Sequence, residues 1–314
     1  MRFQATPAAA GVFILAAALL AGCAAPQISG LIEQRPAGLP DTAEIAAVPF
    51  FPQEDYQCGP ASLAAVLVHA GRDATPESLL PQVYLPGRKG SLQVEMLATA
   101  RRHRLVAYPL APRMEDLLRE LAAGTPVVVL QNLALDWWPQ WHYAVAIGYD
   151  LGRRELVLRS GVTRRLTMSL DTFEHTWARS GHWAMAALPP DRLPATAAES
   201  SYLAAVAALE RVAPAAARTG YETGLARWPR SVAAQIGLGN ASYAMRDLPG
   251  AAAAYLRATM DHPEAADAWN NLAQALHELG SRAQALAAAR RAVSLGGPRL
   301  PAYRETLDGI LRKP

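Results

Sequence analysis

The sequence predicts an α+β domain followed by an all-α helical-repeat domain. In the first part, apolar residues recur at helical spacing and later alternate with polar residues, as they do in strands. Three prolines within residues 188–194 then interrupt the pattern, because proline continues neither a helix interior nor a central strand. Beyond them the chain is rich in alanine and shows a period of 34 residues. We therefore expect a domain boundary at residues 188–194.

Helices are expected early in the first part, each from its own start or stop signal. Pro60 suits a first helical position and Gly71 suits a C-terminal cap, so a helix runs between them with Cys58 at its N-terminal end. Further helices are predicted from a cap and first position at residues 75–76, from an apolar repeat at 92–98 that follows Ser91, and from a pattern at 114–123 that ends at Gly124.

The periodicity then changes to that of strands. Strand-like runs are found at residues 126–130, 142–149, 155–159, 164–169 and 182–188. This order, with helices first and a mostly antiparallel sheet after them, is typical of an α+β domain.

Cys58 is the candidate nucleophile. At a helix N-terminus, unpaired N–H groups and the helix dipole favour a negative charge, and the thiolate is the nucleophilic form of cysteine. We therefore expect a lowered pKa for this thiol. Gln53 offers a side-chain N–H that could join the Cys58 backbone N–H as an oxyanion hole. The alternative is a buried cysteine that acts as a small hydrophobe.

A catalytic cysteine needs a base, and the chain holds seven histidines. His69 lies on the Cys58 helix, roughly 16 Å further along its axis, and cannot reach the thiol. His142 and His182 each precede a strand-like run, which places them at strand ends on a rigid sheet. Both remain candidates on this ground. The other histidines lie in less suitable segments: His103, His175, His262 and His277.

Two motifs in combination carry a family resemblance. Gln53-x4-Cys58-Gly-Pro-Ala-Ser-Leu is followed by His142-Tyr-Ala-Val-Ala-Ile-Gly-Tyr-Asp. The pair resembles the papain-like cysteine peptidases that cut bacteriocin leaders after a double glycine. The resemblance implies an α+β papain-like cysteine peptidase domain, which we place at residues 44–190. It also implies that Cys58 is the nucleophile, His142 the base and then the acid, and Gln53 the oxyanion donor. His182 stays as the second candidate for the base.

The third catalytic residue departs from the family pattern, which has an aspartate on the strand after the histidine strand. A hairpin turn near Leu151 places position 160 roughly opposite His142, and Ser160 occupies it. A serine hydroxyl can orient an imidazole but cannot offset its positive charge. Either Ser160 performs a weaker version of the role or a residue from another segment does it. The alternatives are Asn132, Asp136 and Asp150.

Three tryptophans lie just before His142: Trp137, Trp138 and Trp141. They could wall a substrate groove, because an indole gives a large apolar contact and a polar handle. Equally, they could be part of the core.

The N-terminus has the pattern of an export signal over residues 1–22. Arg2 supplies the positive charge, residues 8–20 the apolar segment, and Leu20-Ala21-Gly22-Cys23 the cleavage context. This tetrapeptide resembles a bacterial lipobox. The resemblance implies that Cys23 is lipidated and that the chain is an outer-membrane lipoprotein facing the periplasm. The alternative is an uncleaved membrane helix. Residues 23–43 are expected to be a tether, since 26–41 are rich in proline, glycine and polar residues.

The alanine-rich part resembles tetratricopeptide repeats. Four positions that recur with the 34-residue period are Ala217, Tyr221, Gly224 and Pro229, then Ala251, Tyr255, Ala258 and Pro263. We expect an all-α tetratricopeptide helical-repeat domain at residues 198–314, with repeats at about 198–231, 232–265 and 266–299 and a capping helix at 301–312. The alternative is a generic alanine-rich bundle. Repeat stacks form extended concave surfaces, which implies a protein partner.

Charge argues against a nucleic-acid partner. The formal net charge is +3 and the pI is about 9.0, but the arginines are scattered and form no basic stripe with interleaved aromatic residues. No metal or organic cofactor is expected.

These features together predict an exported, lipid-anchored cysteine peptidase that hydrolyses a peptide or protein substrate. All credible catalytic positions precede the boundary at 188–194, so the repeats are expected to recruit a partner and to be separable from the first domain. Two other functions remain open. One is a non-catalytic scaffold that binds peptides, for which Ser160 in place of aspartate is the best support. The other is a thiol acyltransferase that transfers the acyl group to an amine.

Overall fold

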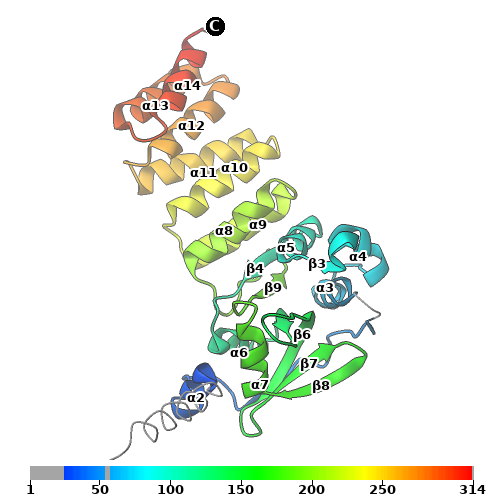
Figure 1. The fold of residues 1–314 in the computed structure, drawn as a ribbon. Helices are drawn as coiled ribbons and strands as arrows, with labels where there is room; N and C mark the ends of the chain where they lie inside the picture. The colour runs from blue at the N-terminus through cyan, green and yellow to red at the C-terminus, as the bar shows by residue number, and fades with distance from the viewer. Residues whose placement is uncertain (1–24, 54–56, 313–314) are drawn as a thin grey trace, which may run out of the picture.

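The computed structural model describes residues 25–53 and 57–312 of the 314-residue chain. It contains a domain built on a β-sheet and, beyond residue 188, a stack of paired helices that leads to the C-terminus (Figure 1). The expected export signal and its lipidation residue, Cys23, lie outside the described residues. Within residues 25–53 and 57–312, no helix combines the length and the apolar character needed to cross a membrane.

The sheet domain has one large sheet and one small one. Its strands are β1 (Thr42–Glu44), β2 (Tyr84–Leu85), β3 (Gly90–Ser91), β4 (Val106–Pro109), β5 (Val127–Asn132), β6 (Trp141–Asp150), β7 (Glu155–Ser160), β8 (Thr163–Ser169) and β9 (Ala184–Leu188). The large, seven-stranded sheet has the order β4-β9-β5-β6-β7-β8, with β1 paired to the far end of β6. All of these pairings are antiparallel, as is that of β2 with β3.

Helices cover both faces of the large sheet. One core lies between the sheet and α3 (Cys58–His69), α4 (Pro76–Val83) and α5 (Gln93–Arg102), and the other lies between the sheet and α2 (Pro26–Glu33), α6 (Met114–Ala122) and α7 (Leu170–Ala178). Successive side chains of a strand point to opposite faces. Val127 and Val129 of β5 therefore enter the α6 and α7 core, and Val128 enters the α3 core. Because β5 is buried on both faces, its sequence is a continuous apolar run.

The expected helices and strands of this domain are all present, with ends that shift by a few residues. Sequence reasoning missed β1 and β4, which are three and four residues long. Segments of that length are too short for a hydrophobic period to be recognised.

The expected tether at residues 23–43 is wrong for the part that the structure describes. Residues 26–33 form α2, whose Ile28 and Leu31 are buried in the core beneath the sheet. Residues 42–44 then pair with β6 as strand β1. Proline and glycine content suggested a linker, but two apolar side chains three positions apart are enough to bury one face of a short helix.

A buried carboxylate fixes the start of α2. The side chain of Glu174 on α7 accepts hydrogen bonds from the backbone N–H groups of Gln27 and Ile28, each at 3.0 Å. These are first-turn donors that have no partner within the helix. The start of α2 is therefore attached to α7 by both apolar and polar contacts.

Ile28→Ala tests whether α2 belongs to the folded domain. Ile28 is fully buried, so its truncation should lower the free energy of unfolding by about 2–5 kcal/mol in urea or thermal denaturation. Ser29→Ala is the matched control, because Ser29 is exposed on the same helix and its replacement should have little effect. Equal stabilities of the two variants would mean that α2 is a tether after all.

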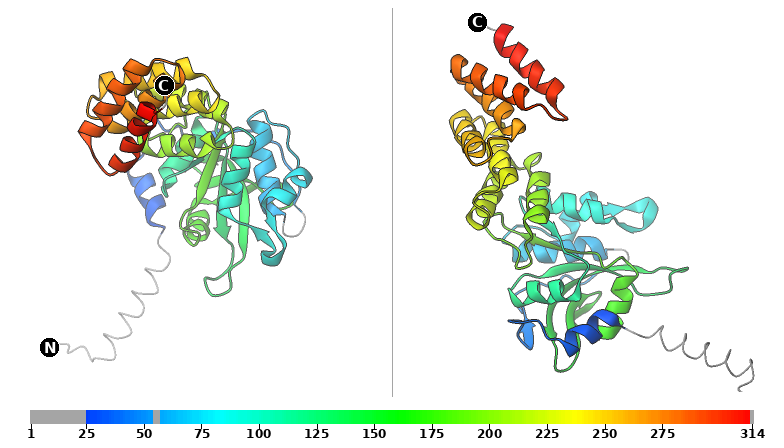
Figure 2. Two further views of the ribbon diagram at one scale, coloured as in Figure 1. Left: turned by 90° about the horizontal axis from the view of Figure 1, so that it is seen from above. Right: turned by 90° about the vertical axis from the view of Figure 1, so that its left-hand side faces the viewer.

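The second part of the chain, as far as residue 312, consists of three successive helix pairs and a final single helix, α14. Its helices are α8 (Glu199–Glu210), α9 (Pro214–Arg227), α10 (Val232–Ala244), α11 (Leu248–Asp261), α12 (Ala266–Glu278), α13 (Arg282–Leu295) and α14 (Leu300–Arg312). The second helices of the pairs begin at residues 214, 248 and 282, so they recur every 34 residues. Figure 2 shows the pairs following one another as a curved stack. Neighbouring helices approach closely at small residues: a Cβ on Gly237 would lie 2.2 Å from the ring of Tyr221.

The first helix pair shares a core with the sheet domain. Helix α8 packs along β4, and its Tyr202 and Val206 are fully buried in the same core as Val106. In the connecting segment, the carboxylate of Glu120 accepts hydrogen bonds from the Thr196 backbone N–H at 2.8 Å and hydroxyl at 2.7 Å. The boundary at residues 188–194 thus separates two patterns of secondary structure and not two independent cores. This packing contradicts the expected separability.

Two truncations test this shared core. A chain that ends after Pro194 loses Tyr202 and Val206, exposes the apolar edge at β4, and should lose its cooperative melt in circular dichroism. A chain that ends after Ser231 keeps α8 and α9 and should still melt cooperatively. If both truncations melt like the full chain, the sheet domain does not depend on α8.

Candidate active site

Helix α3 places Cys58 at the edge of a cleft. The helix begins at Cys58, is buried from Gly59 to Leu67, and packs against β5, β6, β7 and β9. Gly59 permits a close approach to β3, since a Cβ at this position would lie 2.2 Å from the Ser91 hydroxyl oxygen. The helix ends as expected, with Gly71 at a φ of +76° just beyond it. Cys58 itself is partly exposed, so its sulfur is accessible from the cleft.

The cleft has a volume of about 970 Å³. It brings together Gln53, Cys58 and His142, three of the residues that the sequence singled out. Its other walls come from the 3-10 turn η1 (Pro86–Arg88) with the β3 region, the segment before β6, and the end of α7. These walls consist of residues 88–93, Leu130, residues 139–141, Tyr143, Gly161, Arg179 and Ser180.

His142 is hydrogen-bonded to Ser160. The distance from the His142 Nε2 to the Ser160 Oγ is 2.8 Å. When Nε2 carries the proton and donates it to the hydroxyl, Nδ1 is left as the free basic nitrogen. Ser160 therefore contacts the imidazole as predicted, and its role in catalysis stays a prediction.

The strand register that brings His142 and Ser160 together differs from the predicted one. Val145 pairs with Arg159, which puts Ser160 across from Ala144, two residues away from His142. A bulge in β6 between Ala146 and Gly148 shifts the register. The contact is therefore diagonal, and diagonal neighbours on a sheet are within reach of a long side chain.

The three alternatives to Ser160 are engaged elsewhere. Asn132 Oδ1 accepts hydrogen bonds from two backbone N–H groups of the loop that follows it, at 3.1 and 2.9 Å. Asp136 is exposed and faces Arg179 at 3.7 Å. Asp150 accepts a hydrogen bond within the turn at the opposite end of β6. None of these contacts involves His142.

His182, the second candidate for the base, does not line the cleft. Its ring meets that of Trp177 edge-on, with centroids 4.8 Å apart. Its Nε2 lies 3.3 Å from the Gln27 Nε2 on α2. These contacts make His182 a structural residue between α2, α7 and the start of β9.

Gln53 lies in the cleft with Cys58. Its backbone N–H donates a hydrogen bond to the Gly161 carbonyl at 3.1 Å, which fixes its position. Its side-chain Oε1 is buried and has no hydrogen-bond partner among the described residues. This oxygen can only accept a hydrogen bond, whereas the predicted oxyanion role would use the side-chain N–H.

The expected lowering of the Cys58 pKa is wrong. Burial raises the pKa of the Cys58 thiol, and hydrogen bonds from backbone N–H groups, including that of Tyr143, only reduce this shift. Burial also lowers the pKa of His142. Both shifts favour a neutral thiol and a neutral imidazole. The expectation considered only the helix N-terminus and omitted desolvation, and Ser160 supplies no negative charge to stabilise an imidazolium.

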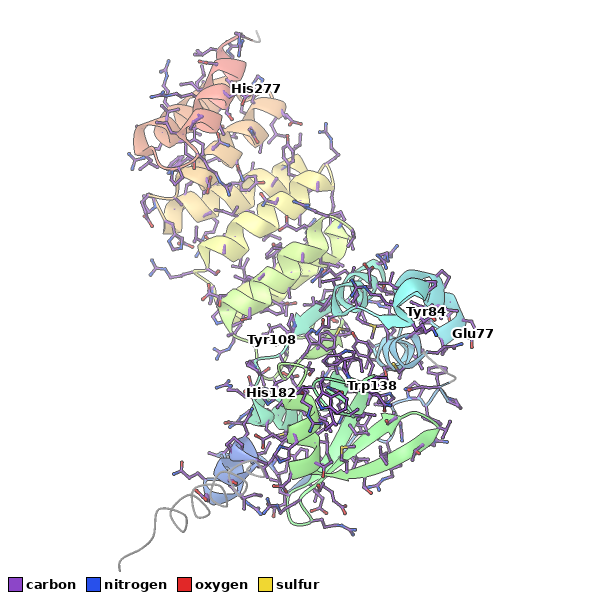
Figure 3. The ribbon with its side chains drawn as sticks, viewed as in Figure 1. Glu77, Tyr84, Tyr108, Trp138, His182 and His277 are labelled. Atoms are coloured by element: carbon purple, nitrogen blue, oxygen red, sulfur yellow. The ribbon has the colours of Figure 1, made fainter. Side chains whose placement is uncertain are left out.

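The three tryptophans are not core residues. Trp137, Trp138 and Trp141 are 78%, 67% and 53% exposed. Trp141 lines the cleft, so the groove-wall interpretation fits this residue. Trp137 and Trp138 lie outside the cleft lining, and Trp138 is labelled in Figure 3.

Sequence reasoning missed another wall of the cleft. It is formed by residues 88–93, which are connected to β6 by a hydrogen bond from the Tyr143 hydroxyl to the Ser91 carbonyl at 3.2 Å. It also missed Arg179 and Ser180 at the end of α7. No local pattern marks these residues, because they reach the cleft from segments that are far apart in the chain.

Comparison with known proteins gives a match over the part of the chain that holds this site. Residues 45–185 match the Peptidase_C39 like family. We refer to this stretch as the C39-like domain. The match supports the peptidase part of the resemblance drawn from the Gln53, Cys58 and His142 motifs, and it does not extend to the leader or the helix pairs.

A crystal structure of a candidate C39-like peptidase from Bacillus anthracis is similar to 48% of this chain and 98% of its own, with 20% identity and a TM-score of 0.41. No curated protein matches the chain.

Ser160→Asp should give His142 the charged partner that it lacks. A carboxylate within hydrogen-bond reach raises the pKa of an imidazole by roughly 1–3 units and so stabilises a thiolate–imidazolium pair. In the wild type, alkylation of Cys58 by iodoacetamide should accelerate only above the ordinary thiol pKa of about 8.5. In Ser160→Asp, the acceleration should occur at lower pH.

Ser160→Ala is the control, because it removes the hydroxyl and adds no charge. Its alkylation profile should resemble that of the wild type. A wild-type profile that already reaches its plateau below about pH 7 would contradict the neutral pair, since it would require a depressed thiol pKa.

Proposed function

We propose that the C39-like domain is a cysteine peptidase. The His142 Nδ1 takes the Cys58 proton as the sulfur attacks a peptide carbonyl carbon. The imidazolium then gives that proton to the leaving amine as the C–N bond breaks. Water, deprotonated by the same imidazole, hydrolyses the thioester and restores the thiol. The Gln53 side chain and the Cys58 backbone N–H donate hydrogen bonds to the oxyanion.

The observation that carries this proposal is the convergence of Cys58, His142 and Gln53 in one cleft. The Ser160 contact orients the imidazole so that one ring nitrogen remains free. Because both pKa shifts disfavour a preformed ion pair, the thiol loses its proton during the attack and not before it. Such an enzyme should be slower than one in which a carboxylate supports the imidazolium.

One observation favours a non-catalytic role as the second candidate. The raised pKa of Cys58 leaves little thiolate at neutral pH. In this role the cleft, with Trp141 on its wall, would bind peptides without cleaving them.

We also propose that Cys23 is lipidated and anchors the chain to the outer membrane on its periplasmic side. The motif Leu20-Ala21-Gly22-Cys23 supports this. The helix pairs are proposed to be tetratricopeptide repeats that bind a protein partner. Their 34-residue spacing and their close approach at glycine support that assignment.

The test compares the N-termini of periplasmic proteins in cells that produce the wild type or Cys58→Ala. A set of termini should depend on Cys58 and identify the substrates. With such a substrate in vitro, Gln53→Ala should lower turnover by roughly 10²–10³-fold while alkylation of Cys58 stays normal.

His277→Ala is the control, because this histidine lies in α12, far from the cleft (Figure 3). It should leave the set of termini unchanged. Identical termini in the wild-type and Cys58→Ala cells would overturn the peptidase and leave peptide binding as the function of the cleft.

A further inference from the structure

Large apolar side chains project from the loop between β5 and β6, which we call the tryptophan loop (residues 133–140). Leu135, Trp137 and Trp138 are 51%, 78% and 67% exposed, and the proposed reaction uses none of them. The loop has a defined backbone. Its ends are joined by a hydrogen bond from the Leu133 N–H to the Gln140 carbonyl at 2.9 Å, and the Asn132 side chain bonds to three of its backbone groups. An exposed apolar cluster on a fixed backbone is typical of a binding surface.

The tryptophan loop and the start of α2 lie at the same end of the sheet. Helix α7 contacts both: Glu174 binds the first turn of α2, and the Arg179 guanidinium donates hydrogen bonds to the carbonyls of Asn132 and Ala134. Glu174 lies in α7 and Arg179 is its C-cap residue, five positions further on, which is about 7.5 Å along a helix. The positions of α2, α7 and β6 can be followed in Figures 1 and 2.

From Pro26 onward the chain is folded onto the domain and does not form a tether. Helix α2 begins at Pro26, three residues after Cys23. Three residues span at most about 10 Å. A lipid on Cys23 would therefore hold this end of the sheet at the bilayer surface, next to the exposed indoles.

We propose that the tryptophan loop docks the C39-like domain onto the membrane, with Trp137 and Trp138 in the interfacial layer. Tryptophan favours this layer because its ring is amphipathic. The proposal rests on the lipidation of Cys23, which is itself proposed above. The helix pairs extend from the side of the domain that lies away from α2 (Figure 1) and would remain free for a partner.

This orientation also narrows the substrate class. Gln140 at the end of the loop lines the cleft, as do Trp141 and Arg179, so the cleft would open close to the bilayer surface. The favoured substrate is a peptide segment that lies on the membrane or emerges from it.

The experiment uses the full chain in vesicles of phosphatidylethanolamine and phosphatidylglycerol, some of whose lipids are brominated near the headgroup. Bromine quenches tryptophan emission on contact. Emission of the bound wild type should be quenched, and the double variant Trp137→Ser and Trp138→Ser should lose at least about half of the quenched signal. Trp269→Phe, which removes an indole of the repeats, is the matched control and should not reduce the quenched signal. Cys58→Ala should be quenched like the wild type, so this result does not depend on peptidase activity.

Membrane-bound wild type whose emission is not quenched, or is quenched equally in the double variant, would overturn the docking proposal. The proposal would also be overturned if the double variant were quenched like the wild type but had a higher KM for a peptide in detergent. That result would make the loop a substrate-binding wall. A wild-type dimer in detergent that the double variant disrupts would assign the loop to a second copy of the chain. The lipid anchor is tested separately by membrane fractionation. If the Cys23→Ser variant fractionates with membranes like the wild type, lipidation is contradicted.

Discussion

Helix α3 is buried along nearly its whole length against four strands of the large sheet, and the position of the candidate nucleophile follows from that burial. The apolar face of the sheet fixes the helix, Gly59 brings the first turn against Ser91, and the thiol of Cys58 is left at the open end. The same sheet carries His142 on β6. The two groups are thus held by a rigid core and not by flexible loops, as a catalytic pair requires.

The burial that positions the pair also sets its electrostatics. Removing water disfavours both a thiolate and an imidazolium, which explains the raised pKa of Cys58 and the lowered pKa of His142. A carboxylate beside the imidazole would oppose this effect, but Ser160 offers only a hydrogen bond. Cys58 and His142 thus share one cleft, and Ser160 gives the imidazole no charge. The proposed peptidase reaction would then transfer the thiol proton during the attack on the substrate.

The sheet domain and the helix pairs are joined because α8 packs against the edge strand β4. Tyr202 and Val206 of α8 complete a core that begins in α2 and α6. Glu120 binds the connecting segment at Thr196. Helix α2 and the helix pairs thus attach to different sides of one rigid domain. An anchor before α2 and a partner of the helix pairs would therefore each have a fixed position relative to the cleft.

The sequence by itself determined most of the helices and strands and pointed to the candidate reacting groups. Hydrophobic period, caps and turns are local, so the Cys58 helix, the His142 strand and the 34-residue helix pairs could all be predicted. Tertiary structure decided what depends on distant contacts. It recruited α2 to the core, shifted β6 by a bulge so that His142 meets Ser160 diagonally, and satisfied Asn132 within its own loop. It also reversed the expected shift of the Cys58 pKa, because desolvation is the sum of all neighbours and no local pattern records it.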